Sequence, residues 1–255
     1  MLEPAINLVL ATLKEIRDSQ ERKPRVSRET LLRFVDARLQ MAPSRPLNKA
    51  TRLEILNSRV CSCTKCPHLA KSRTQTVFGV GNPDAELMFV GEAPGADEDL
   101  RGEPFVGRAG QLLTRIIETM GLRRSDVYIA NILKCRPDMP KGASGNRPPT
   151  PEEMQTCISY LLEQLEIIQP RVIVALGATA VEGLLGVRRT MRELRGRWHS
   201  FNDMPLMITY HPSYLLRNQM LSEKRKVWED MLSVLESLEK PISEKQRKYF
   251  LTPAD

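Results

Sequence analysis

The chain lacks any apolar stretch that approaches the roughly 20 residues of a membrane-spanning helix. Its first ten residues also lack the basic segment and the cleavage site of a secretory signal peptide. No internal repeat divides the sequence. We therefore expect a protein without membrane association and with a cytoplasmic location.

Length and charge bound the remaining possibilities. A chain of 255 residues, 41% of them hydrophobic, can bury one sizeable core and carry a small appendage. The formal net charge of +7 is suited to a polyanionic partner. The same charge is also found on mildly basic soluble proteins that bind no polyanion, so it does not identify a partner by itself.

The two ends of the chain differ from its middle. Residues 1–45 contain two helical apolar stripes followed by a Pro-containing linker, which predicts a helical N-terminal extension. This extension could serve packing and solubility, or it could contact a partner or DNA. We expect residues 46–240 to form the main domain and residues 241–255 a poorly ordered C-terminal tail.

Strand-like and helix-like segments alternate through the main domain. Helices are expected over residues 49–60, 109–120 and 179–185, after Thr150, and over a C-terminal apolar stripe that ends near Leu238. Near-continuous apolar runs between helices are typical of strands buried on both faces. The pattern predicts an α/β fold, a three-layer α/β/α sandwich around a mostly parallel four-stranded sheet. The four strands are expected at residues 87–90, 127–133, 172–176 and 206–210.

Five cysteines in a cytosolic chain favour metal or redox chemistry over disulfide bonds. Cys63 and Cys66 form a Cys-x-x-Cys pair, which can grip one metal centre, whereas Cys135 and Cys157 are single and could each be core residues. Four thiolates suit a 4Fe-4S cluster or a structural zinc ion, and the wide spacing of the later two favours the cluster. Cys61 is either a spare thiol or a substitute for Cys63.

Two predicted strands end in polar motifs. The run at residues 86–90 stops in Gly-Glu-Ala-Pro-Gly, and the run at residues 206–210 stops in His-Pro-Ser-Tyr-Leu-Leu-Arg. Ligands of open α/β sheets bind beyond the carboxyl ends of the strands. Glu92 and His211 could therefore converge on one pocket, although each alone could be an ordinary turn residue.

Together with residues 102–110 (Gly-Glu-Pro-Phe-Val-Gly-Arg-Ala-Gly), these motifs closely resemble those of the family 4 uracil-DNA glycosylases, base-excision enzymes that carry an iron–sulfur cluster. The resemblance runs from about residue 63 to about residue 238. It implies that residues 46–240 are the catalytic domain of a monofunctional DNA-repair hydrolase. Such an enzyme flips uracil out of DNA and hydrolyses its N-glycosidic bond, leaving an abasic site. The implied partner is uracil-containing DNA, and we expect a monomer.

The resemblance also implies roles for individual residues. Glu92 would stabilise the positive charge that develops at the sugar C1′ or orient the attacking water, and His211 would donate a hydrogen bond to the departing base. Asn131 would read the uracil edge and Phe105 would stack on the ring. Further substrate contacts are implied at Gly91, Ala93, Glu98 and Ser213, with Glu98 facing the 5-position of the ring. A structural 4Fe-4S cluster would be held by Cys63, Cys66, Cys135 and Cys157.

The His211 motif also carries candidate DNA contacts. Leu215 and Leu216 are expected to be an exposed apolar wedge that fills the gap left by the flipped base, although as plain sequence they could equally start a helix. Arg217 would contact phosphate. Basic residues elsewhere that could do the same are Lys134, Arg136 and Arg147. Some close relatives of the family trap DNA covalently through a histidine in an inserted loop; residues 138–149 contain none, so we expect turnover by water.

Two other functions remain open at this point. An iron–sulfur DNA-binding or electron-transfer module would share the cysteines and the basic charge but would not need Glu92, Asn131 and His211. A zinc-stabilised nucleic-acid adaptor would bind metal at the same thiolates. Release of uracil from an oligonucleotide distinguishes the glycosylase from an iron–sulfur module without activity. A brown colour of the purified protein indicates an iron–sulfur cluster and excludes the zinc-stabilised adaptor.

Overall fold

The computed structural model describes residues 47–140, 142–143 and 145–251. From Asn48 onward, the described residues belong to one compact unit. The helical extension and linker predicted for residues 1–45 lie outside the described residues. No helix in the described part of the chain is long and apolar enough to cross a membrane.

The centre of the unit is a six-stranded sheet with the order β1-β3-β2-β4-β6-β5. The four inner strands are parallel to one another, which confirms the predicted α/β class and the parallel four-stranded core. The two edge strands, β1 and β5, pair antiparallel and were not predicted. The strands are β1 (Val80–Gly81), β2 (Leu87–Gly91), β3 (Tyr128–Asn131), β4 (Val172–Leu176), β5 (Trp198–Phe201) and β6 (Met204–Thr209).

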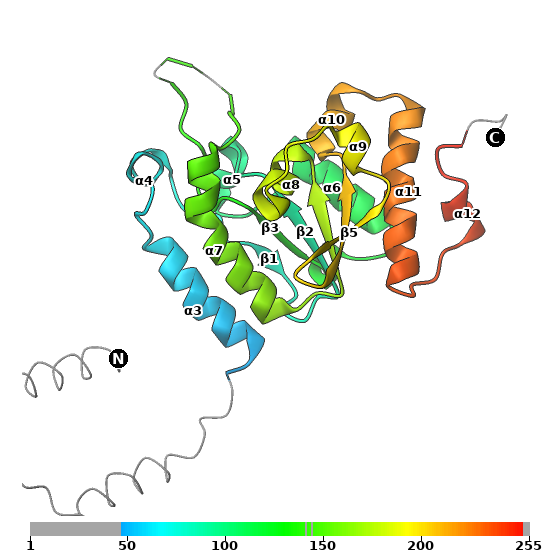
Figure 1. Cartoon of the computed structure of the whole chain (residues 1–255), viewed down its shortest axis with the longest axis horizontal. Helices are drawn as coiled ribbons and strands as arrows, with labels where there is room; N and C mark the ends of the chain where they lie inside the picture. Colours follow the sequence, from blue (N-terminus) through cyan, green and yellow to red (C-terminus); the bar gives the residue numbers. More distant parts are fainter. Residues whose placement is uncertain (1–46, 141, 144, 252–255) are drawn as a thin grey trace, which may run out of the picture. The chain divides into compact units, whose positions relative to one another are not determined.

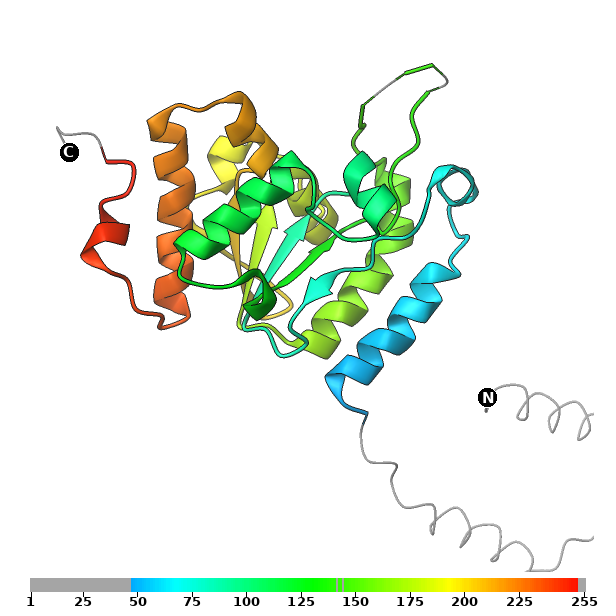
Figure 2. The same ribbon diagram turned by 180° about the vertical axis from the view of Figure 1, so that it is seen from behind.

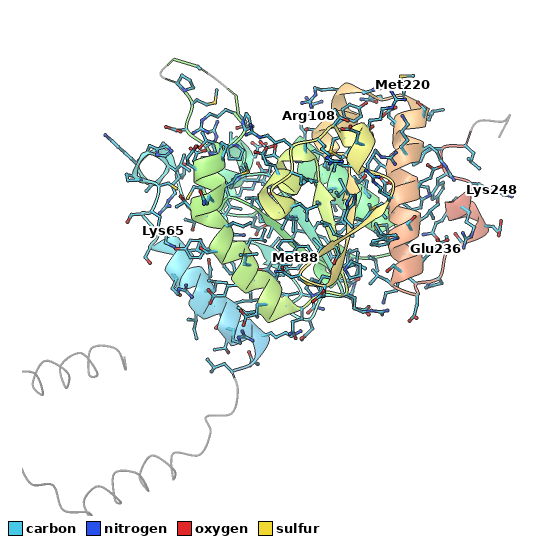
Figure 3. All side chains as sticks on the ribbon, viewed as in Figure 1. Lys65, Met88, Arg108, Met220, Glu236 and Lys248 are labelled. Atoms are coloured by element: carbon cyan, nitrogen blue, oxygen red, sulfur yellow. The ribbon has the colours of Figure 1, made fainter. Side chains whose placement is uncertain are left out.

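Helices cover both faces of the sheet, which gives the predicted three layers (Figures 1 and 2). Side chains alternate along each strand, so Met88 and Val90 pack into one core while Leu87 and Phe89 pack into the other. Met88 has no exposed surface and lies inside the molecule in Figure 3. One face is covered by α3 (Lys49–Cys61), α7 (Pro151–Ile168) and α8 (Ala178–Leu185), the other by α6 (Arg108–Thr119) and α11 (Leu221–Ser237).

The sequence also fixes where α7 begins. Thr150 is the N-cap: its Oγ1 accepts a hydrogen bond from the Glu153 backbone N–H at 3.2 Å, and Glu153 Oε2 accepts one from the Thr150 N–H at 2.7 Å. This reciprocal cap satisfies two backbone donors that the first turn leaves without partners. The shorter helices are α4 (Pro67–Ser72), α5 (Ala96–Arg101), η1 (Arg124–Asp126), α9 (Met191–Leu194), α10 (Pro212–Arg217) and α12 (Glu244–Arg247).

The segment after residue 240 differs from the expected poorly ordered tail. It contains α12, and the Trp228 indole N–H donates to the Gln246 carbonyl at 2.6 Å. The Gln246 side-chain amide in turn donates to the carbonyl of Thr119 at 2.9 Å. These long-range bonds fasten the segment to α6 and α11, so the expectation of poor order is wrong for residues 241–251.

Candidate active site

A cleft of about 610 Å³ opens beyond the carboxyl ends of the parallel strands. The arrows of these strands point toward the edge of the sheet at which α10 lies (Figure 1). This is the position at which open α/β sheets bind ligands. The cleft is lined by Glu92, Ala93, Pro94, Gly95, Glu98, Phe105, Ala109, Asn131, Asn146, Arg147, Pro148, Gly177, Ala178, His211, Ser213 and Arg217.

Glu92 follows β2 directly and lines the cleft. Burial raises the pKa of this carboxyl, because a carboxylate loses hydration when water is excluded. The hydroxyl of Thr179, in the first turn of α8, donates a hydrogen bond to the carboxylate and partly offsets the rise in pKa. The side chain is thus partly desolvated, and Thr179 keeps its pKa from rising further.

His211 is the N-cap of α10, and its ring faces the same cleft. Its Nδ1 accepts a hydrogen bond from the Ser213 backbone N–H at 3.2 Å. Burial, together with the positive charge of Arg217, lowers the pKa of His211 to about 4. The ring is therefore neutral at pH 7, and because Nδ1 accepts, the proton resides on Nε2, which is free to donate to a ligand.

Asn131 ends β3 next to Gly91 of β2. Its Oδ1 is the only buried side-chain nitrogen or oxygen of the described residues that has no hydrogen-bond partner. A buried amide oxygen without a partner is costly and rare. Because Asn131 lines the cleft, this acceptor is available to a donor that enters the cleft.

Phe105 forms one wall and adopts a left-handed backbone conformation, with φ of 54°. Its ring lies 5.6 Å from the His211 ring, centroid to centroid. A Cβ on Gly110 would lie 1.9 Å from the carbonyl of Phe105, so the close approach of α6 to this strained turn requires glycine. The turn holds the aromatic ring beside the imidazole.

Glu98 lines the cleft, but backbone groups occupy both of its oxygens. Oε1 accepts from the N–H groups of Val106 and Gly107, each at 2.9 Å, and Oε2 accepts from Gly95 N–H at 3.1 Å. The carboxylate therefore fastens two cleft loops together. Its predicted contact with the 5-position of a pyrimidine stays a prediction.

Two sequence-based expectations about exposed residues are wrong. Leu215 is buried because α10 packs against α6, so only Leu216 of the expected apolar wedge retains partial exposure. Lys134 is buried too, where its Nζ donates to the Asn131 carbonyl at 3.0 Å and to Gln164 Oε1 at 2.6 Å. It supports the Asn131 turn from behind and cannot reach phosphate.

Gly91 lies behind the cleft rather than on its surface. It is buried, and a Cβ placed there would lie 2.4 Å from both Asn131 Oδ1 and Phe105 Cζ. The residue contributes space for the two side chains. Of the other residues singled out from the sequence, Ala93, Ser213 and Arg217 line the cleft.

Sequence reasoning missed the contribution of α8. Gly177 has a φ of 88°, and a Cβ there would lie 2.9 Å from the Cβ of His211. Ala178 lines the cleft beside it, and Thr179 binds Glu92. The available signal was a glycine placed directly after an apolar strand, the same arrangement that ends β2 at Gly91.

The loop between β3 and α7 closes one side of the cleft. Arg147 donates to Glu153 Oε1 at 2.7 Å and also binds Asp138, so its guanidinium joins both ends of the loop. His68 lies 2.8 Å from Glu153 Oε1. His68, Asp138 and Glu153 lie close enough together to bind a metal ion. Arg147, however, already forms ion pairs with the carboxylates of Asp138 and Glu153.

Four of the five cysteines converge elsewhere. Cys63, Cys66, Cys135 and Cys157 line one small cavity, and none forms a disulfide. Burial raises the pKa of Cys66, Cys135 and Cys157, the last to about 11. Arg73 donates to Cys135 Sγ at 3.0 Å, and Lys134 N–H to Cys157 Sγ at 3.3 Å. Cys61 is exposed and lies outside this cavity.

Comparison with known proteins adds to this geometry. The sequence model of the Uracil DNA glycosylase superfamily matches residues 78–232, which include the whole lining of the cleft. The chain is 48% identical over 183 residues to the Type-4 uracil-DNA glycosylase of Thermotoga maritima, covering 70% of this chain and 91% of that protein. It is 44% identical over 180 residues to the Type-4 uracil-DNA glycosylase of Archaeoglobus fulgidus, covering 68% and 87%. A Type-5 uracil-DNA glycosylase of Pyrobaculum aerophilum is 32% identical over 190 residues, covering 62% and 81%.

Proposed function

The chain belongs to the uracil DNA glycosylase superfamily, and we propose that the cleft at the carboxyl edge of its sheet is where it removes uracil from DNA. It is a uracil-DNA glycosylase, a hydrolase that excises uracil in DNA repair. The single observation that supports this site most directly is the meeting of Glu92, Asn131 and His211 in one cleft.

Asn131 and Phe105 recognise the base. Uracil must leave the helical stack to reach a cleft of this kind, because its Watson–Crick edge is otherwise paired. The unpartnered Oδ1 of Asn131 accepts the N3–H of the flipped ring, and its amide N–H₂ can donate to the adjacent carbonyl. The face of Phe105 provides the stacking surface.

Glu92 and His211 act on the bond itself. As the bond between C1′ and the base nitrogen breaks, its electron pair leaves with the base and positive charge grows at C1′. The Glu92 carboxylate stabilises that charge and orients the water whose oxygen then bonds to C1′; one proton of that water ends on the departed base, which leaves as neutral uracil. His211 donates from Nε2 to the base carbonyl on which negative charge develops, and it does so as a neutral donor.

We further propose that Cys63, Cys66, Cys135 and Cys157 hold a 4Fe-4S cluster. Four thiols without disulfides around one small cavity fit the donor set of such a cluster. The same donor set also suits zinc, and iron and sulfide analysis of the purified protein decides between them. A bound cluster would act as a structural crosslink here, and every step at the cleft is carried out by other residues.

Two minor proposals concern the state of the protein. The proposed mechanism uses Glu92, Asn131, Phe105 and His211 of a single copy, so a monomer would be sufficient for activity. Reduced cysteine ligands require a reducing compartment, which supports a cytoplasmic location.

The test is single-turnover release of uracil from a duplex by the wild-type protein and by Glu92→Ala and His211→Ala. Each variant is expected to lose about 10² to 10⁴ in rate, the usual range for one catalytic acid–base or oxyanion donor group. Thermal melting should remain close to that of wild type. Cys61→Ser serves as the control, because Cys61 is exposed and outside both the cleft and the cysteine cavity. Normal release by both alanine variants would reject the assignment.

A further inference from the structure

Three exposed arginines surround α9, outside the cleft. The segment of residues 186–200 contains five arginines and a single acidic residue, Glu193. Arg188 pairs with Glu182, and Arg195 is half-buried. Within the described chain, Arg189, Arg192 and Arg197 are exposed and form no ion pair that meets a 4.0 Å limit.

The one local carboxylate does not cancel this charge. Glu193 accepts from the Thr190 backbone N–H at 3.0 Å and from its hydroxyl at 2.8 Å, so it caps α9. Hydrogen bonds from Thr190, with the nearby charges of Arg189 and Arg197, lower the pKa of Glu193. The guanidinium groups of Arg189 and Arg197 therefore lie near the single carboxylate of Glu193, and the net charge around α9 is positive.

Trp198 follows Arg197 and keeps 40% of its surface exposed. Exposed tryptophan is uncommon on a surface that touches only water, and indole rings stack on bases and on sugars. We call Arg189, Arg192, Arg197 and Trp198 the α9 surface.

The α9 surface is fastened beside the catalytic histidine. Arg195 donates to Asp230 Oδ1 at 2.8 Å, and Thr209 donates to Oδ2 of the same carboxylate at 2.6 Å. The Arg195 guanidinium also lies 5.4 Å from the centre of the Tyr210 ring, and Tyr210 immediately precedes His211. Both views show α9 beside α10 at the same edge of the sheet (Figures 1 and 2).

We propose that the α9 surface binds the sugar–phosphate backbone of the DNA beside the target nucleotide, with the three arginines on phosphates and Trp198 against the strand. This inference rests on the proposed function in that DNA is the substrate. A nucleotide flipped into the cleft must pass its flanking backbone over the edge that carries α9 and α10. Arg197 donates to the Glu193 backbone carbonyl, but none of the three guanidinium groups has a carboxylate partner among the described residues, so all three can neutralise phosphates and release their counterions.

The first test measures binding of a uracil-free duplex as a function of salt. The double variant Arg189→Gln/Arg192→Gln should bind roughly tenfold or more weakly than wild type near 0.1 M salt. Its slope of log K against log salt should be smaller by about 2, because each lost phosphate contact removes about 0.9. Lys245→Gln/Lys248→Gln is the matched control, since these exposed residues have the same spacing and lie on the C-terminal segment, where Lys248 is seen in Figure 3.

The second test needs no charge change. The chain has two tryptophans, of which Trp228 is buried and Trp198 is exposed. Addition of uracil-free DNA should quench the fluorescence of the wild-type protein, and Trp198→Phe should abolish that quenching while DNA binding persists. Quenching that survives in Trp198→Phe would overturn the contact at Trp198.

The experiments distinguish failure of the α9 surface from failure of the proposed uracil excision at the cleft. At subsaturating protein, Arg189→Gln/Arg192→Gln should release uracil more slowly than wild type, because the α9 surface contributes to binding of the substrate, whereas Lys245→Gln/Lys248→Gln should release it at the wild-type rate. An unchanged salt slope, or an equal loss in the lysine control, overturns the α9 surface even if uracil release is normal. A wild-type protein that binds uracil-free DNA through these arginines yet releases no uracil contradicts the proposed function alone.

Discussion

Glu92 and His211 occupy one cleft but respond to pH in different ranges. Burial raises the pKa of Glu92 and lowers that of His211 to about 4. As the pH falls, Glu92 is therefore protonated at a higher pH than an exposed glutamate. It loses its negative charge before His211 gains a positive one. His211 is mostly neutral from about one pH unit above its pKa of about 4, so its donor function varies little with pH from mildly acidic to neutral solution.

The acid limb of the pH profile for uracil release should therefore belong to Glu92 and should depend on Thr179. Thr179→Val removes the hydrogen bond that lowers the pKa of Glu92, so the limb should move to higher pH. Thr179→Ser keeps a hydroxyl and should restore the wild-type profile. Single-turnover rates across pH measure the shift, and identical profiles for all three proteins would exclude a role of Thr179 in tuning Glu92.

Replacement of Gly91 by alanine should close the base pocket from behind. The new Cβ would lie 2.4 Å from Asn131 Oδ1 and from Phe105 Cζ, so both side chains must shift. We expect uracil release to fall by roughly 10²-fold, with a stability loss of about 1–3 kcal/mol from overpacking.

Gly121→Ala is the control for that stability loss. Gly121 has a φ of 84° but open space around its Cβ position, so alanine costs about 1–2 kcal/mol there without touching the cleft. Melting curves and single-turnover rates should separate the two variants. Comparable activity in both would show that the pocket tolerates a methyl group at residue 91.

At the residue scale, the sequence predicted which residues line the cleft better than it predicted which neighbouring residues are buried. Glu92 and His211 could be found because each comes just after an apolar strand, and parallel strands bring such positions to one edge. Asn131, the last residue of β3, could be found only through the family resemblance. The burial of Leu215 and Lys134 could not be predicted. It depends on which face α10 turns toward α6 and on the partners that Gln164 and Asn131 offer, and neither is a property of the local sequence.

The short helix α5 is held from two sides. Both oxygens of buried Asp99 lie 3.0 Å from the Thr74 backbone nitrogen and accept its N–H. Arg73, the residue before Thr74, donates to Cys135 Sγ and to the Cys63 carbonyl at 2.8 Å. Glu98, the residue before Asp99, fastens the cleft loops. Residues 73–74 therefore join the cysteine cavity to the cleft through α5.

Removal of this link should weaken both regions together. Asp99→Leu removes the buried carboxylate that accepts the Thr74 N–H, and loss of a hydrogen bond to a charged group costs about 1.5–3 kcal/mol, whereas Asp99→Asn keeps an acceptor and should cost less. We expect Asp99→Leu to retain less metal and to release uracil more slowly than Asp99→Asn. Metal content, melting temperature and rate measured on the same preparations test the link, which is rejected if the two variants behave alike.

Elements with strong local signals were predicted closely. The α6 stripe, the α7 cap and the β4 strand match their predicted positions within a residue or so. The edge strands were missed because β1 has only two residues and β5 alternates exposed and half-buried positions. Such strands are defined by pairing with a neighbour, which acts over long range and leaves little trace in a short sequence window.

At the scale of the whole molecule, the four cysteines around the cavity come from three separate parts of the chain. Cys63 and Cys66 lie just before α4, Cys135 follows β3, and Cys157 lies on α7. A metal centre bound by all four would close long loops and bind only the folded state. The sheet and both apolar cores do not depend on the thiols, however, so the fold should survive without metal.

Loss of the metal centre should therefore lower stability without unfolding the protein. Without metal, burial keeps Cys157 protonated at neutral pH, since its pKa is raised to about 11, and a neutral thiol packs as a small apolar side chain. A loss of about 2–4 kcal/mol corresponds to a fall in melting temperature of roughly 5–15 °C for a domain of this size. Melting of metal-loaded and chelator-treated protein measures the fall. Cys135→Ser should reproduce it, Cys61→Ser should not, and equal melting of loaded and stripped protein would exclude the crosslinking role.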